Sequence, residues 1–325
     1  MIVCTIPLLW LLSDQLSSLF SVAPYVSACY PANGIIVGYF LVFGCRFTPY
    51  LTAIVITHII YWQMGQFSTV FDFIQGIRHQ IVYGGMGMIL FSYFRISVPF
   101  ARVRDIGLFV MGSIVATLTS AIAAAASFYG YHLTDHEHIF ALVTSFWIGD
   151  LTGLVVFCPI IIQVLLWMRR HLLDSESLTG RPLMFDLRLD QVVIATVALI
   201  IVKVLPDIFS LKENAVLLMV IPITFVALQS GYLAAITITA YINILMGLSN
   251  HLFFSPLAAN DLQMLMLTTG ISGLFVGILS EEGRRSGSAL QQLARQNHLL
   301  AAAAQASPTP MSVIDTDQQE IPICS

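Results

Sequence analysis

Long apolar blocks, separated by short polar connectors, constrain this chain more than any other feature. The blocks run for roughly 15 to 30 residues, the length that crosses a hydrocarbon core of about 30 Å as a helix. Buried strands would instead give apolar runs of roughly 4 to 8 residues. Only 10% of the residues are charged, whereas a soluble domain usually has about 25%. The sequence therefore predicts an all-α, polytopic transmembrane helix bundle.

The blocks predict about ten spans, or about eight if the shortest do not cross. The first block lacks the basic start of a signal peptide, so we interpret it as a span. The second and eighth blocks are too short to cross upright, and we expect half-spans inside the bundle. The predicted spans are residues 2–23, 32–45, 48–64, 73–95, 105–131, 138–169, 190–209, 214–228, 231–249 and 260–282.

The basic residues favour one side of this layout. Under the positive-inside rule, the arginine-rich side is the cytoplasm, which places both termini there. Only Lys203, Lys212 and Arg78 lie on or near the other side. The arginines on the predicted cytoplasmic side are Arg46, Arg95, Arg102, Arg104, Arg169, Arg170, Arg181, Arg188, Arg284, Arg285 and Arg295.

Two segments resemble each other. YLTAIVITHIIYWQMG (50–65) and YLAAITITAYINILMG (232–247) agree at about nine positions without a gap. Each follows a short segment that opens near an asparagine, Asn33 or Asn214, and both run in the same direction. This pattern predicts a parallel internal repeat. Chance similarity between Ile-, Ala- and Thr-rich helices is the alternative.

The character of the chain changes after the last block, which predicts a membrane domain (1–283), a cytoplasmic signalling helix (284–305) and the start of a further domain (306–325). The helix favours a homodimer, because apolar residues and one asparagine follow heptad spacing over about two heptads. These heptad residues are Leu290, Leu293, Asn297 and Leu300.

One acidic residue, Asp150, lies within the block 138–169 between Gly149 and Gly153. A carboxylate at the centre of a spanning helix costs roughly 3 kcal/mol, so we expect it to face a partner or a cavity. The two glycines allow another backbone to approach closely. Two interpretations remain open, a polar clasp between helices and a ligand- or proton-sensing group. The cations available to it are Arg78, His79 and Lys203.

An outer loop contains His132, Asp135, His136, Glu137 and His138 within seven residues. Imidazole and carboxylate together suit a divalent metal such as zinc or nickel, which makes the three histidines candidate ligands. A solvated helix cap is the alternative, and we assign no metal and no cofactor.

Several function classes are excluded. No HExxH, GxSxG or Walker A sequence is present, so we expect no enzymatic activity from these residues. The net charge is −4 and the basic residues form no stripe, so we expect no nucleic-acid partner.

Two motifs resemble a known family, the membrane-associated sensor type-one domain. Residues 30–35 (YPANGI), followed by 44–46 (GCR), resemble its first signature, and 146–153 (FWIGDLTG), running on to Cys158 and Pro159, resemble its second. The resemblance covers residues 1–285 and implies a multi-pass sensor module of the bacterial inner membrane. The candidates for a sensing or structural role are the signature residues together with two of the basic residues. They are Pro31, Asn33, Gly34, Arg78, His79, Trp147, Gly149, Asp150, Gly153 and Pro159.

The family precedes histidine kinases and enzymes that make or degrade cyclic di-GMP, so the resemblance implies such an output after this module. Residues 299–325 resemble the start of a PAS domain. We therefore expect a sensor that responds to an unknown small-molecule or protein stimulus, embedded in the lipid bilayer. The alternatives are a secondary transporter, which also uses short spans and buried polar groups, and a remnant that has lost its output.

Overall fold

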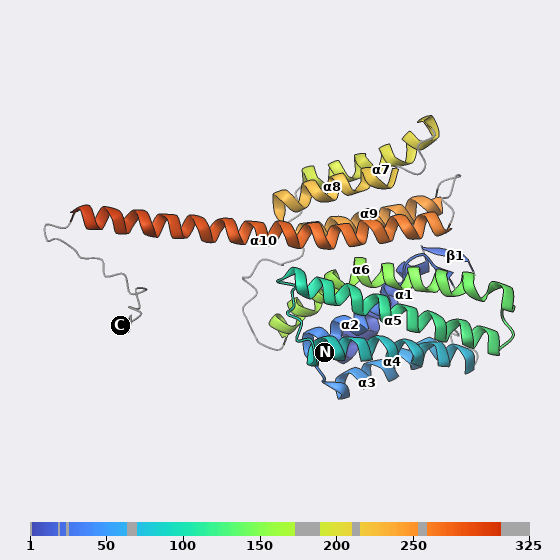
Figure 1. Cartoon of the computed structure of the whole chain (residues 1–325). Helices are drawn as coiled ribbons and strands as arrows, with labels where there is room; N and C mark the ends of the chain where they lie inside the picture. The colour runs from blue at the N-terminus through green and yellow to red at the C-terminus, as the bar shows by residue number, and fades with distance from the viewer. Residues whose placement is uncertain are drawn as a thin grey trace, which may run out of the picture. The chain divides into compact units, whose positions relative to one another are not determined.

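The computed structural model describes residues 2–18, 20–23, 26–63, 70–172, 189–209, 215–252 and 259–306 (Figure 1). This part of the chain is an all-α bundle, as predicted, and each predicted span corresponds to one helix. The helices are α1 (Ile2–Ser18), α2 (Ala32–Phe43), α3 (Phe47–Gln63), α4 (Val70–Ser92), α5 (Val103–Gly130), α6 (Ile139–Leu172), α7 (Leu189–Phe209), α8 (Ala215–Ser230), α9 (Tyr232–Leu252) and α10 (Ala259–Ala306).

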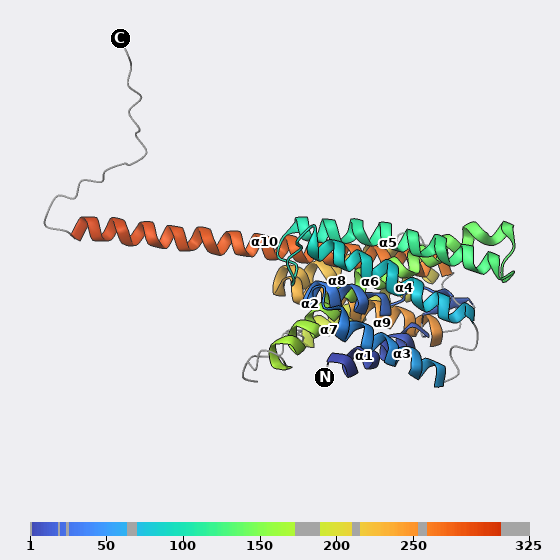
Figure 2. The same ribbon diagram turned by 90° about the horizontal axis from the view of Figure 1, so that it is seen from below.

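The chain divides into two compact units, Met1–Glu281 and Glu282–Ser325. In the first unit the helices lie alongside one another, as both views show (Figures 1 and 2). In the second unit the side chains of residues 283–302 are mostly exposed, including the predicted heptad residues. Residues 299–306 of the predicted PAS-like start belong to α10, and the rest of it lies outside the described residues.

Apolar side chains cover the outside of the bundle. On α3, Leu51, Val55 and Ile59 repeat every four residues and each exposes more than half of its surface. A stripe of this kind would be unfavourable in water but is what lipid requires. Four described helices are long and apolar enough to cross a membrane: Val103–Gly130, His136–Arg170, Tyr232–Asn250 and Asn260–Ala302. The other spans remain predictions.

The first helix is shorter than the predicted span 2–23. It ends at Ser18, and a small antiparallel hairpin follows, formed by β1 (Ser21–Ala23) and β2 (Val26–Ser27). Near the helix end, the hydroxyl groups of Ser17 and Ser18 donate to the carbonyl oxygens of Asp14 and Gln15. Such local hydrogen bonds compete with further helical turns.

Both copies of the predicted repeat have the same local structure. A short apolar helix, α2 or α8, ends at a glycine with positive φ, Gly44 at 67° or Gly231 at 81°. Each glycine N–H donates to the carbonyl oxygen four residues earlier, that of Phe40 or Ala227. Glycine adopts this backbone conformation without strain, so the chain turns directly into α3 or α9.

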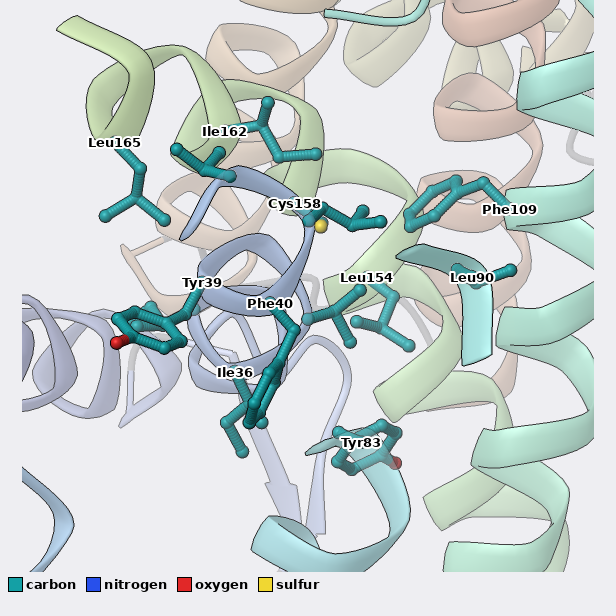
Figure 3. Close-up of a cluster of buried hydrophobic side chains, with 14 of the residues drawn as sticks. Ile36, Tyr39, Phe40, Tyr83, Leu90, Phe109, Leu154, Cys158, Ile162 and Leu165 are labelled. Carbon is teal, nitrogen blue, oxygen red and sulfur yellow. The ribbon is translucent and has the colours of Figure 1, made fainter. Parts of the chain in front are cut away.

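The core consists of two apolar clusters, and α6 contributes to both. Every residue of α2 is buried, as expected for a half-span inside the bundle. Figure 3 shows Ile36, Tyr39 and Phe40 of α2 among side chains from α4, α5 and α6. The expectation was wrong for α8, because Ile221 and Leu228 each expose more than 60% of their surface.

Arginines gather where α2, α4 and α6 end. The Arg169 guanidinium donates to the carbonyl oxygen of Val42 at 2.8 Å, and the Cys45 thiol contacts the Ser92 hydroxyl at 3.4 Å. Arg102 precedes the first residue of α5 at the same end. We call this the arginine end of the bundle, and the opposite end the cavity end.

Candidate functional site

The two signature motifs meet in the structure although they lie more than a hundred residues apart. Gly149 and Gly153 of α6 face the backbone that joins the hairpin to α2. A Cβ at Gly149 would collide with the carbonyl oxygen of Ser27, and one at Gly153 with that of Tyr30. The Tyr30 N–H also donates to the carbonyl oxygen of Gly149 at 3.3 Å. The glycine pair therefore does allow a close backbone approach, as predicted.

Asp150 joins three helices through hydrogen bonds to one carboxylate oxygen. The Tyr83 hydroxyl of α4 donates to Asp150 Oδ2 at 2.6 Å, and the Ser120 hydroxyl of α5 donates to the same atom at 3.5 Å. All three side chains are buried. The carboxylate thus forms a polar clasp that fixes α4, α5 and α6 relative to one another.

The basic neighbours of Asp150 form a second layer. Arg78 donates to the backbone oxygen of Ser120 at 2.5 Å and contacts His79 Nε2 at 2.8 Å, so it reaches the carboxylate through Ser120. The His79 ring stacks between Tyr30, at 5.4 Å, and Tyr83, at 5.8 Å. These contacts join the motif before α2 to the clasp.

The start of α2 completes the surroundings of the clasp. Pro31 precedes the first residue of α2 and Asn33 is fully buried. The Asn33 amide lies near the Asp150 carboxylate, but neither of its polar side-chain atoms has a hydrogen-bond partner among the described residues. A Cβ at Gly34 would lie 3.0 Å from the Cα of Cys158. This glycine therefore permits the close packing of α2 on α6.

The remaining signature residues lie along α6. Trp147 precedes the clasp by three residues, and its buried indole N–H has no partner among the described residues. Pro159 lies inside α6, where it cannot donate the usual helical hydrogen bond to Val155.

A cavity of about 350 Å³ opens beside the clasp, at the cavity end of the bundle. Its wall is mostly apolar, and we call it the polar cavity after the charged and amide side chains that it contains. Its walls come from α1, the hairpin, α3, α4, α5 and α6, and include Arg78, His79 and Asp150. The amide of Gln75, one helical turn before His79, also lines it, and neither polar atom of that amide has a partner among the described residues. Buried polar atoms of this kind are usually satisfied by water or a ligand.

One side chain connects this region to α10. The Gln263 amide, in the second turn of α10, donates to the carbonyl oxygen of Ser145 at 3.0 Å and to that of Ser27 at 3.5 Å. Ser27 lines the polar cavity and Ser145 precedes Asp150 by five residues on α6. The last helix of the bundle therefore begins in contact with the cavity wall.

Other predicted groups do not assemble. His132, His136 and His138 are exposed in the loop between α5 and α6, where η1 (His136–His138) precedes α6. No group of three potential metal ligands exists among the described residues. The side chain of Lys203 lies outside the described set.

Sequence reasoning missed Tyr83, Ser120, Gln75 and Gln263. The α4 residues had a detectable signal, because Gln75, His79 and Tyr83 follow one another every four residues and share a helical face. Ser120 also had a signal, because Ser113, Thr117 and Ser120 lie on one face of α5. Gln263 lies close to Asn260 and Asp261 at the start of α10, and nothing in that stretch pointed to Ser27 or Ser145.

The family model of MASE1 matches residues 2–284. MASE1 is a membrane-associated sensor domain of signalling proteins. No curated protein and no solved structure matches the chain.

Proposed function

Because the chain belongs to the MASE1 family, we propose that it detects a stimulus within its helix bundle and transmits it through α10 to a cytoplasmic output domain. Family membership supports this function over secondary transport. The observation that carries the proposal is the hydrogen bonding of Gln263, which connects the start of α10 to Ser27 and Ser145 beside the polar cavity.

The proposed signal is a change in the position of α10. A ligand shifts an equilibrium only if it binds one arrangement better than another. A molecule in the polar cavity would contact Ser27, whose carbonyl oxygen accepts from Gln263, so occupancy acts directly on the start of α10. Close packing transmits the movement, because Gly270 lies against Val156 and Gly273 against Thr239.

The proposed receiver is a dimer. In the second unit, Leu290, Leu293 and Leu300 each expose more than half of their surface at heptad spacing. Pairing of two such helices would bury these leucines and pass a rotation or slide onward. The proposed outputs are a histidine kinase or an enzyme of cyclic-di-GMP synthesis or degradation, entered through a PAS-like segment after residue 306.

The proposed location is the bacterial inner membrane, with both termini in the cytoplasm. Support comes from the grouping of Arg46, Arg102 and Arg169 at one end of the bundle, which the positive-inside rule assigns to the cytoplasm. The polar cavity then faces the outer side.

The test is a fusion of residues 1–306 to a dimeric diguanylate cyclase reporter, with Gln263→Leu compared to the unchanged fusion. A hydrogen bond contributes about 1 kcal/mol, so its loss should change the basal output roughly fivefold in either direction. The matched control is Gln291→Leu, at an exposed position of α10 outside the heptad seam. Equal basal output from Gln263→Leu and the unchanged fusion, at equal membrane abundance, would contradict the proposal.

A further inference from the structure

Two side chains of α4 bring unpartnered polar atoms to the polar cavity. Gln75 and Arg78 both line it, and each has buried side-chain atoms without a hydrogen-bond partner among the described residues. These atoms are Nε2 and Oε1 of Gln75 and Nε of Arg78. Residues three apart on a helix share a face, with roughly 5–6 Å between their Cβ atoms. The two side chains can therefore contact the same ligand.

The Arg78 guanidinium is held by its two terminal nitrogens, which leaves its Nε–H. One terminal nitrogen donates to the Ser120 carbonyl oxygen, and the other contacts His79 Nε2 at 2.8 Å. Its neighbours thus hold the Nε–H in place before a ligand arrives. A group that is already ordered loses little entropy on binding, so this donor suits recognition of a ligand.

The unpartnered atoms form a pattern of two donor groups and one acceptor. The Arg78 Nε–H and the Gln75 amide nitrogen donate, and Gln75 Oε1 accepts. Turning the amide by half a turn leaves the pattern unchanged, because both of its polar atoms lack partners among the described residues. A neutral carboxamide group, with a carbonyl oxygen beside an N–H, complements both kinds of atom. A carboxylate offers only acceptors and an ammonium group only donors, so either would leave a buried polar atom unsatisfied.

Three aromatic rings from three helices form a wall beside these atoms. Phe71 of α4 meets Phe128 of α5 edge to face at 4.9 Å between ring centres, and Phe128 lies 5.6 Å from Phe146 of α6. All three rings line the cavity. Gln75 follows Phe71 by one turn of α4. The Arg78 guanidinium lies 6.0 Å from the centre of the Phe146 ring. A flat apolar body can therefore contact the rings while its polar group reaches Gln75 and Arg78.

We propose that the polar cavity binds a small, neutral, planar molecule that carries a carboxamide-type group, as in an amide, a lactam or a urea. Gln75 and the Arg78 Nε–H bind this group, and the three phenylalanine rings contact its apolar body. The volume of about 350 Å³ lies at the small end of ligand-binding cavities. The inference rests on the proposed sensor function and names the class of its stimulus.

The other titratable groups of the wall have roles or contacts of their own. Asp150 keeps its hydrogen bonds to Tyr83 and Ser120. Asp14, Asp72 and His58 also line the cavity and take part in further interactions, so we assign no ligand atom to them.

Calorimetric titration of the purified full chain in detergent tests this proposal, after subtraction of the heat measured with empty micelles. The probe is benzamide, which is compared with three molecules of similar shape. Benzoate and acetophenone offer acceptors but no donor, as an anion and as a neutral ketone, and benzylammonium offers donors but no acceptor. We expect benzamide to bind and each of the other three to bind at least about tenfold more weakly, where tenfold is 1.4 kcal/mol.

One variant locates the site. Gln75→Met keeps the length of the side chain, removes its donor and acceptor, and breaks no hydrogen bond to a described residue. It should weaken benzamide binding at least about tenfold and abolish the preference for benzamide over acetophenone, because the Oε1 acceptor is gone. The matched control is Gln15→Met, at an exposed position of α1, which should leave both unchanged.

No benzamide binding at millimolar concentration, equal binding of any of the three comparison molecules, or an unchanged benzamide affinity in Gln75→Met would overturn the proposal. The comparison of probes uses the unchanged chain, so it tests the proposal even if the Gln75 variant fails to fold. Titration involves no output domain, so its failure is distinct from failure of the Gln263 reporter test.

Discussion

At the scale of single residues, the clasp at Asp150 shows how a carboxylate is kept inside an apolar bundle. One carboxylate oxygen accepts hydrogen bonds from the hydroxyl groups of Tyr83 and Ser120. The Arg78 guanidinium donates to the backbone oxygen of Ser120. Hydrogen bonding to neutral hydroxyl groups satisfies the acid without a direct ion pair to Arg78. Asp150 therefore connects three helices, and it also forms part of the cavity wall.

Tyr83→Phe tests the clasp. The change removes the shorter hydrogen bond and leaves a buried carboxylate oxygen with a weaker partner, so we expect a loss of about 1–3 kcal/mol in the free energy of unfolding. Denaturant unfolding in mixed micelles measures it. The control is Tyr93→Phe, since Tyr93 is 79% exposed. Equal stability of the two variants would show that the Tyr83 hydroxyl contributes nothing to the fold.

Asp150 itself was predictable, because an acid in the middle of an apolar block is costly and must be compensated. The hydrogen-bond partners of Asp150 were not predictable. The sequence offered Arg78, His79 and Lys203 as cations, and the structure uses hydroxyl groups on α4 and α5 for direct contact. Polar residues share one face on α4 and on α5, but a sequence does not show which of these faces packs against Asp150.

At the scale of elements, helix contacts depend on small residues. The backbone of Tyr30 packs against Gly153, the side chain of Thr239 against Gly273 and that of Ala235 against Gly277. In lipid, where helices gain little from burying apolar surface, such close packing is a main source of association.

Gly153→Ala tests the contact between the two signature motifs. Its Cβ would overlap the Tyr30 carbonyl group, so α6 and the segment before α2 must separate. We expect a loss of about 2 kcal/mol or more in unfolding free energy, typical of overpacking. Gly85→Ala on α4 is the matched control, because a Cβ at Gly85 would meet no atom within 4 Å. A Gly153 variant as stable as the Gly85 variant would mean that the motifs do not depend on this approach.

The helices themselves follow from the apolar blocks, and the glycine turns at Gly44 and Gly231 follow from the short connectors. The hairpin after α1 could not be predicted. Strands of three and two residues are too short to show an alternating pattern. The strand pair is stabilised by its surroundings, for example by the hydrogen bond from the Gln263 amide to the Ser27 carbonyl oxygen.

At the scale of the whole molecule, the apolar outer surface points to lipid as the surrounding medium, and polar side chains of α5 face inward. The exposed side chains of α5 include Met111, Val115 and Ile122, whereas Ser113, Thr117 and Ser120 of the same helix are buried. A water-soluble helix usually shows the opposite arrangement.

Val115→Asp tests this arrangement, because Val115 is 61% exposed near the middle of α5. A carboxylate facing lipid costs roughly 3 kcal/mol of insertion free energy, so we expect less protein in the membrane fraction. Leu299→Asp is the control, since Leu299 is 68% exposed in the second unit. A higher yield of soluble protein from Val115→Asp would indicate that α5 faces water.

The central claim is that the polar cavity and the arginine end lie on opposite sides of the membrane, with α10 leaving on the arginine side. Cysteine labelling of intact cells with a membrane-impermeant maleimide tests it in a background without the five native cysteines. We predict that Asp135→Cys is labelled in intact cells, whereas Arg170→Cys and Ser288→Cys are labelled only after the membrane is opened. Labelling of Asp135→Cys and Ser288→Cys from the same side would contradict the account.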